Sequence, residues 1–194
     1  MSYLYADEAL LDRMVRAVEK VRDRLRRAAA ALERSGVPYA VAGGNAVAAW
    51  VATVDESAIR NTPDVEILLG RDDLPAAVNA MEAVGFVYAE HNAQMFLDSA
   101  DLSSRHGVRI CFALERDGEA RMPVTEFEDL LILDQVRFLS LATLVKRLLL
   151  SNRTVALVLV RDLLDVGLID ASWCKRLPAE LAARLQHLLD TPEG

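Results

Sequence analysis

The sequence predicts an α+β fold, in which a small mixed β-sheet is flanked by helices and followed by a C-terminal helical annex. A long stretch without glycine or proline opens the chain, short β-forming stretches fill its middle, and the last third is helical in pattern. With 194 residues, 53% of them hydrophobic, the chain can bury one good-sized core. We therefore expect a long helix over residues 1–35 packed on a sheet-containing core over residues 36–139. Residues 140–194 are expected to form the annex, within the same compact unit.

The first helix is expected from Asp7 to Arg34, where Ala, Leu, Arg and Glu dominate. Gly36 follows at a position where glycine commonly ends a helix. The charges of this helix indicate a solvated face, which is also a candidate surface for a protein partner.

A strand, a tight turn and a second helix are expected in the stretch VPYAVAGGNAVAAWVA. Residues 37–42 favour a strand, Gly43 and Gly44 form the predicted turn, and Asn45 is expected to cap a helix that ends near Thr53. A glycine pair at such a place lets backbone N–H groups approach an anion, and the first turn of the helix adds unpaired donors. The alternative is a plain tight turn without a ligand.

Two carboxylates stand one residue apart in the next predicted strand, DVEILL, which follows a polar loop over residues 53–63. Because successive side chains of a strand point to opposite faces, Asp64 and Glu66 are expected to share one face. Neighbouring carboxylates repel each other and favour a cation such as Mg²⁺, which prefers oxygen ligands. The alternative is a polar strand face exposed to water.

The remaining elements follow from the same patterns. Helical spacing predicts a helix over residues 71–84, ended by Gly85. Strands are expected in FVYAE, AQMFLD and GVRICFALE, and helices in SLATLVKRLLL and PAELAARLQHLLD. The stretch TVALVLVRDLLDVGLI fits a buried strand as well as a helix, because its first residues alternate between Val and Leu.

Composition argues against several classes of protein. The formal net charge of -7 gives no basic footprint for duplex DNA or an anionic membrane. Cys111 and Cys174 are too few for a disulfide framework and too far apart for a CxxC zinc motif, and His91, His106 and His187 match no nucleophile or metal spacing. The start of the chain lacks an apolar signal core, and no uncharged run approaches the roughly 20 residues that span a bilayer. We expect a cytoplasmic protein without membrane contact.

Together, YAVAGGNAVAAW and TPDVEILL resemble the nucleotidyltransferase fold, in its minimal, antitoxin-associated and AbiEii-like branch of the DNA polymerase beta superfamily. The resemblance implies that Gly43, Gly44 and Asn45 hold the triphosphate of a nucleotide. It implies that Asp64 and Glu66 bind Mg²⁺ and carry the catalysis. The implied activity is transfer of a nucleoside monophosphate from an NTP to an acceptor that the sequence does not identify.

The resemblance continues to about residue 170. The stretches FLSLATLVKRLLL and VRDLLDVGLI are similar to two helices that many family members carry, which implies that Lys146 compensates phosphate charge. Considered without the family, Lys146 is a lysine that extends from an amphipathic helix to water, and Asp162 and Asp165 are ion partners on a helix surface.

This sequence departs from the family pattern in three places. The family's carboxylate pair is usually two aspartates, and Glu66 is longer by one methylene group. Active members carry a third carboxylate on a neighbouring strand, where this chain has Cys111; Glu115 lies about 13 Å further along that strand. Between the two helices named above, where relatives often have further charged residues, only Arg153 is retained.

Arg109, on the same face as Cys111, is an alternative partner that would neutralise the carboxylate pair without a metal ion. Two functions therefore stay open. One is Mg²⁺-dependent nucleotidyl transfer. The other is a catalytically degenerate module that binds a nucleotide or a protein partner, in the manner of a toxin or antitoxin component.

Overall fold

The computed structural model describes residues 8–90, 94–100, 102–103, 106–113, 127–151 and 153–191. The strands are β1 (Tyr39–Ala42), β2 (Val65–Leu69), β3 (Phe86–Ala89), β4 (Met95–Asp98), β5 (Val108–Phe112), β6 (Leu131–Leu133) and β7 (Val136–Phe138). The helices are α1 (Glu8–Arg34), α2 (Gly43–Ala52), α3 (Leu74–Glu82), α4 (Leu141–Leu150), α5 (Thr154–Asp165) and α6 (Ala179–Asp190). Short 3₁₀ helices cover Glu56–Ala58, Arg71–Asp73 and Ala171–Arg176.

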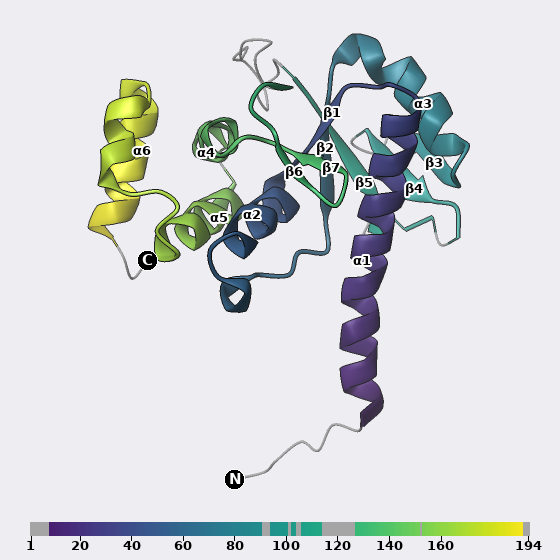
Figure 1. Ribbon diagram of the computed structural model, residues 1–194, viewed down its shortest axis with the longest axis horizontal. Helices are drawn as coiled ribbons and strands as arrows, with labels where there is room; N and C mark the ends of the chain where they lie inside the picture. Colours follow the sequence, from purple (N-terminus) through teal and green to yellow (C-terminus); the bar gives the residue numbers. More distant parts are fainter. Residues whose placement is uncertain are drawn as a thin grey trace.

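The strands form one mixed sheet of seven, in the order β3-β4-β5-β2-β1-β7-β6. Helices α1 and α3 lie on one side of it, and α2, α4, α5 and α6 lie on the other (Figure 1). The predicted α+β fold, with a mixed sheet, flanking helices and a helical C-terminal part, is therefore confirmed. In the described residues, no helix combines the length and the apolar character needed to cross a membrane.

The three central strands bring residues from distant parts of the chain into one row. β1 pairs antiparallel with β2, and β2 pairs parallel with β5. In these registers Ala42 lies beside Glu66, and Glu66 lies beside Arg109. All residues of β1 and β2 except Glu66 are buried, so Glu66 is the charged side chain of these two strands.

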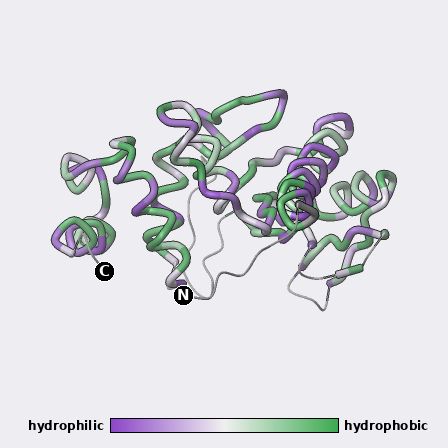
Figure 2. The backbone as a smooth tube through the Cα atoms, turned by 90° about the horizontal axis from the view of Figure 1, so that it is seen from below, coloured by the Kyte–Doolittle hydropathy of each residue, from purple (hydrophilic) through white to green (hydrophobic). Residues whose placement is uncertain are grey.

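The helices cover the sheet with apolar faces, and hydrophobic and hydrophilic residues alternate at short intervals along them (Figure 2). In the second half of α1, Leu25 and Leu32 are buried in the core. The first half of α1 extends beyond the sheet (Figure 1), and its Leu11, Met14 and Val15 are exposed.

Two stretches needed the tertiary structure to be assigned. The ambiguous TVALVLVRDLLDVGLI forms helix α5, with Ala156, Val160 and Leu163 buried at helical spacing. The hairpin of β6 and β7 was not predicted, because strands of three residues are too short to show an alternating pattern. Its turn residues, Asp134 and Gln135, both have positive φ, as a two-residue hairpin turn requires.

Candidate functional site

A cleft of about 990 Å³ lies between the sheet and helices α4 and α5. Gly43 and Gly44, at the start of α2, line it together with Asp64 and Glu66. Residues of β5, α4 and α5 complete the lining. The glycine pair and the carboxylate pair, which are separate in sequence, therefore open onto one cavity.

Gly43 and Glu66 are in close contact within this cleft. Gly43 has a φ of +60°, a left-handed conformation that favours glycine. A Cβ atom at Gly43 would lie 2.3 Å from Oε2 of Glu66 and 2.9 Å from its Cδ. The Glu66 carboxylate thus lies directly over the start of α2, and position 43 needs glycine both for its backbone and for the space.

The predicted role of Asn45 as a helix cap is wrong. α2 begins at Gly43, directly after β1, with Ala42 in the cap position and no side-chain cap. Because the left-handed Gly43 lets the helix start straight from the strand, Asn45 falls inside the first turn. Its Nδ2 donates a hydrogen bond of 2.6 Å to the backbone oxygen of Asp64. Asp64 itself is exposed and precedes β2, which starts at Val65, one residue later than predicted.

Two arginines approach the Glu66 carboxylate, whose side chain is 20% exposed. Arg109 Nε lies 3.9 Å from Glu66 Oε1, as the parallel register of β2 and β5 dictates. Arg153, the residue that precedes α5, places its Nη1 3.5 Å from the same oxygen. Arg109 thus lies within ion-pair distance of Glu66, one member of the carboxylate pair that it was expected to neutralise, and Arg153 is a second cation at the same place.

Two cations compete with a metal ion for the Glu66 carboxylate. Mg²⁺ is usually held by one or two carboxylates together with waters and phosphates, and Glu66 is already paired with Arg109 and Arg153. Within the described part of the chain, no group of three or more His, Cys, Asp or Glu residues could hold a metal ion. Cys111 lines the cleft but lies beside Leu68 rather than Glu66, and Glu115 lies outside the described residues.

The cation that helix α4 contributes to the cleft is Arg147, whereas the family resemblance implied Lys146. Among the described residues that line the cavity, Arg147 is present and Lys146 is not. One residue along a helix changes the direction of a side chain by about 100°, so neighbouring positions face different surroundings. The lining favours Arg147 as the contribution of α4 to the site.

Arg60, which sequence reasoning missed, also lines the cleft and is held by α5. Its Nε and Nη2 donate hydrogen bonds of 2.8–3.2 Å to the carboxylate of Asp162, which is buried. These bonds raise the pKa of Arg60 above its usual value. No local sequence signal marks Arg60, because the pairing spans 102 positions of the chain.

The second helix motif therefore has a structural role. Asp162 is an ion partner, as the pattern suggested, but it is buried rather than on the helix surface, and it anchors the segment before β2 to α5. Arg161 donates hydrogen bonds of 2.8 Å and 2.6 Å to the backbone oxygens of Leu188 and Thr191, at the end of α6. Both residues hold helices together around the cleft.

The wall that α4 and α5 contribute is mainly apolar. Leu144, Leu148, Val155, Val158 and Leu159 line it, and Val155 and Val158 are exposed. The cleft thus combines a charged end, at the row of Glu66 and the arginines, with an apolar side. This arrangement suits a ligand that has an anionic part and a flat or apolar part.

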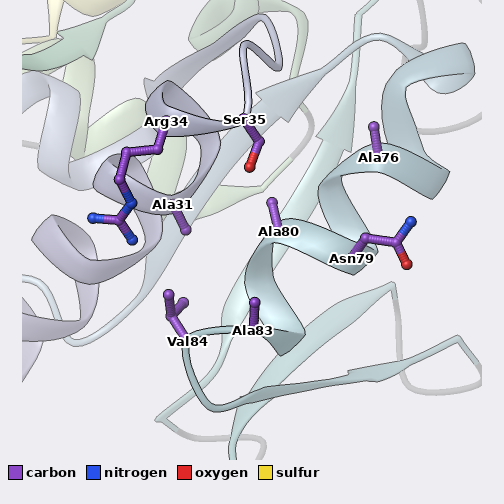
Figure 3. Close-up of a pocket in the computed structure, with 8 residues that line it drawn as sticks. All are labelled: Ala31, Arg34, Ser35, Ala76, Asn79, Ala80, Ala83 and Val84. Carbon is purple, nitrogen blue, oxygen red and sulfur yellow. The ribbon is translucent and has the colours of Figure 1, made fainter.

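A second pocket, of about 360 Å³, lies between the end of α1 and helix α3. Half of its lining residues are alanines, such as Ala31 and Ala80 (Figure 3). Arg34 is the charged residue of this lining, and no carboxylate, histidine or cysteine joins it among the described residues. The pocket lacks the convergent polar groups of a ligand site.

The chain matches no known family model and no curated protein. Among solved structures, it is similar to the antibiotic-resistance factor ANT(2'')-Ia, with 13% sequence identity and a TM-score of 0.47 over 93% of each chain. This is a likeness of overall shape at low identity, and it assigns no activity to this chain.

Proposed function

We propose that this protein binds a nucleoside triphosphate in the cleft and that it is a binding module of nucleotidyltransferase type rather than a transferase. The observation that carries the proposal is the contact of Gly43 with Glu66 beside Arg109. It brings the start of a helix, a carboxylate and a guanidinium to one end of a cavity of about 990 Å³.

The two ends of the cleft match the two ends of a nucleotide. The positive end of the α2 dipole and the arginines that line the cavity favour the phosphate chain. The exposed Val155 and Val158 offer an apolar surface for the base.

Binding without transfer is favoured by the residues around Glu66. The neighbour of Glu66 on β5 is Arg109, and Cys111 stands on the same strand at the position where the family resemblance implies a third carboxylate. The described carboxylates and thiols also form no metal-holding group. A site of this kind keeps the charge needed to hold phosphates and lacks the acidic cluster needed for the chemistry.

Isothermal titration with ATP, CTP, GTP and UTP, each with Mg²⁺ and with EDTA, tests the proposal. We expect saturable binding of at least one of them. Val158→Glu should weaken this binding strongly, because it places a negative charge on the apolar wall at a side chain that is already 38% exposed. Val87→Glu is the matched control, since Val87 is 42% exposed and lies on β3 outside the cleft lining. Absence of binding to all four nucleotides rejects the proposal.

Nucleotidyl transfer is the second candidate, and the presence of both Asp64 and Glu66 in the cleft lining favours it. The test is incubation with an NTP labelled at the α-phosphate, followed by a search for label on protein or RNA. Labelling that Asp64→Ala abolishes while the thermal unfolding curve is unchanged would replace the binding-only proposal with this one.

A further inference from the structure

The Glu66 ion pairs are longer than the ion pair of Asp162, the buried carboxylate of this region. The Arg60–Asp162 pair has hydrogen bonds of 2.8–3.2 Å, whereas the guanidinium nitrogens of Arg153 and Arg109 stand 3.5 Å and 3.9 Å from Glu66 Oε1. Charge-assisted hydrogen bonds between arginine and an oxyanion are normally about 2.7–2.9 Å long. The one carboxylate oxygen accepts a long hydrogen bond of 3.5 Å from Arg153 and none from Arg109 Nε.

Arg109 also keeps an unused donor. Its Nε is buried and has no hydrogen-bond acceptor among the described residues. A buried donor without an acceptor is unfavourable, and few occur in folded proteins. An oxyanion that enters the cleft beside Glu66 would supply the missing acceptor.

A polyphosphate is better suited to these arginines than Glu66 is. It has several charged oxygens, so both guanidinium groups can form their own short, paired contacts. Arg109 and Arg153 together supply two positive charges at the place where the family resemblance implies a divalent cation. Both guanidinium groups already lie at Glu66 Oε1, where they compete with any metal ion for that oxygen.

We infer that the phosphate chain binds directly to Arg109 and Arg153 without a divalent cation, and that Glu66 is an internal anion that occupies the two arginines until the ligand displaces it. This inference rests on the proposed nucleotide binding and deepens it. It also gives Glu66 a role opposite to that of a metal ligand: Glu66 opposes the binding of phosphate.

The sign of one substitution separates the two roles. Glu66→Gln keeps the shape of the side chain over Gly43 and removes its charge. If Glu66 competes with phosphate, this variant should bind ATP and inorganic tripolyphosphate more tightly in EDTA, by on the order of tenfold, since a like charge within several Å is removed. If Glu66 holds a metal ion, the same variant should bind ATP more weakly in Mg²⁺.

Arg153→Ala provides the complementary measurement. Arg153 is 49% exposed and lies outside the regular elements, so we expect the variant to fold and to lose about tenfold in affinity for both probes in EDTA. Arg26 and Asp134 form an ion pair with an N–O distance of 3.0 Å, and neither residue lines the cleft. Arg26→Ala and Asp134→Asn are therefore the matched controls. Neither control should change the affinity by more than about twofold.

The outcomes also distinguish this inference from the function on which it rests. Binding of ATP in EDTA, strengthened by Glu66→Gln and weakened by Arg153→Ala, supports the inference. Binding of ATP that requires Mg²⁺, or that Glu66→Gln weakens, overturns the inference and leaves nucleotide binding standing. If no nucleotide binds with or without Mg²⁺, the proposed function fails first and the inference fails with it.

Discussion

Arg60 and Asp162 join the segment before β2 to helix α5 through three hydrogen bonds of 2.8–3.2 Å. Arg60 is largely exposed, whereas only 8% of Asp162 is accessible. Because Arg60 lines the cleft and α5 forms its apolar wall, the pair sets the distance between the charged end and the apolar side.

Asp162→Asn should therefore destabilise the protein by about 1–3 kcal/mol, since the guanidinium loses its charged acceptor and the buried amide cannot replace it. Urea denaturation followed by circular dichroism measures this change. Asp134→Asn is the matched control: its carboxylate pairs with Arg26 but is 77% exposed, so its effect should stay within about 0.5 kcal/mol. Equal effects of the two substitutions would contradict an anchoring role for Asp162.

Gly43→Ala should destabilise the fold. Gly43 has a φ of +60°, and its added Cβ would lie 2.3 Å from Glu66 Oε2, so the carboxylate must move. Gly36→Ala is a close control, because Gly36 has a φ of +65° and nothing within 4 Å of an added Cβ. Gly36→Ala should cost only the backbone strain, about 1–2 kcal/mol. We expect Gly43→Ala to cost more in urea denaturation.

Substitutions along α1 should reveal which part of this helix stabilises the fold. Leu32 is 1% exposed, and Leu32→Ala should lower the free energy of unfolding by about 2–5 kcal/mol. Leu11 is 65% exposed in the part of α1 that extends beyond the sheet, and Leu11→Ala should change it by less than about 0.5 kcal/mol. Chemical denaturation at one protein concentration measures both. A large loss with Leu11→Ala would mean that this part of α1 is packed in solution.

Tyr39 should make stability depend on alkaline pH. Burial raises the pKa of its phenol above the usual value of 10.0. A pKa that is higher in the folded state contributes stability below pH 10.0, and this contribution is lost as the pH rises through the folded-state value. The urea midpoint of the wild type should therefore fall above pH 10, and that of Tyr39→Phe should fall less steeply. Burial also raises the pKa of Tyr88, but Tyr88 is present in both proteins. The difference between the two curves of urea midpoint against pH therefore reports on Tyr39. Parallel curves for the two proteins would rule out this role.

Local patterns in the sequence were sufficient for most of the helices and the central strands. The long run without Gly or Pro became α1, and the alternation in DVEILL became β2 with Glu66 as its partly exposed residue. These features depend on the periodicity of side chains over a few residues, which the sequence displays directly. The position of the glycine pair at the end of β1 was also evident, because few other residues tolerate a left-handed φ.

The tertiary structure alone decided the character of the site. Arg109 lies beside Glu66 because of the register between β2 and β5. Arg153 reaches the same carboxylate because of the way α5 packs. Asn45 does not cap α2, because the helix begins at Gly43, and its side chain donates a hydrogen bond to the backbone oxygen of Asp64 instead. The sequence by itself determined which charged and flexible residues were available. Which of them meet was decided by strand register and helix packing, because contacts between residues far apart in the chain leave no periodic signal.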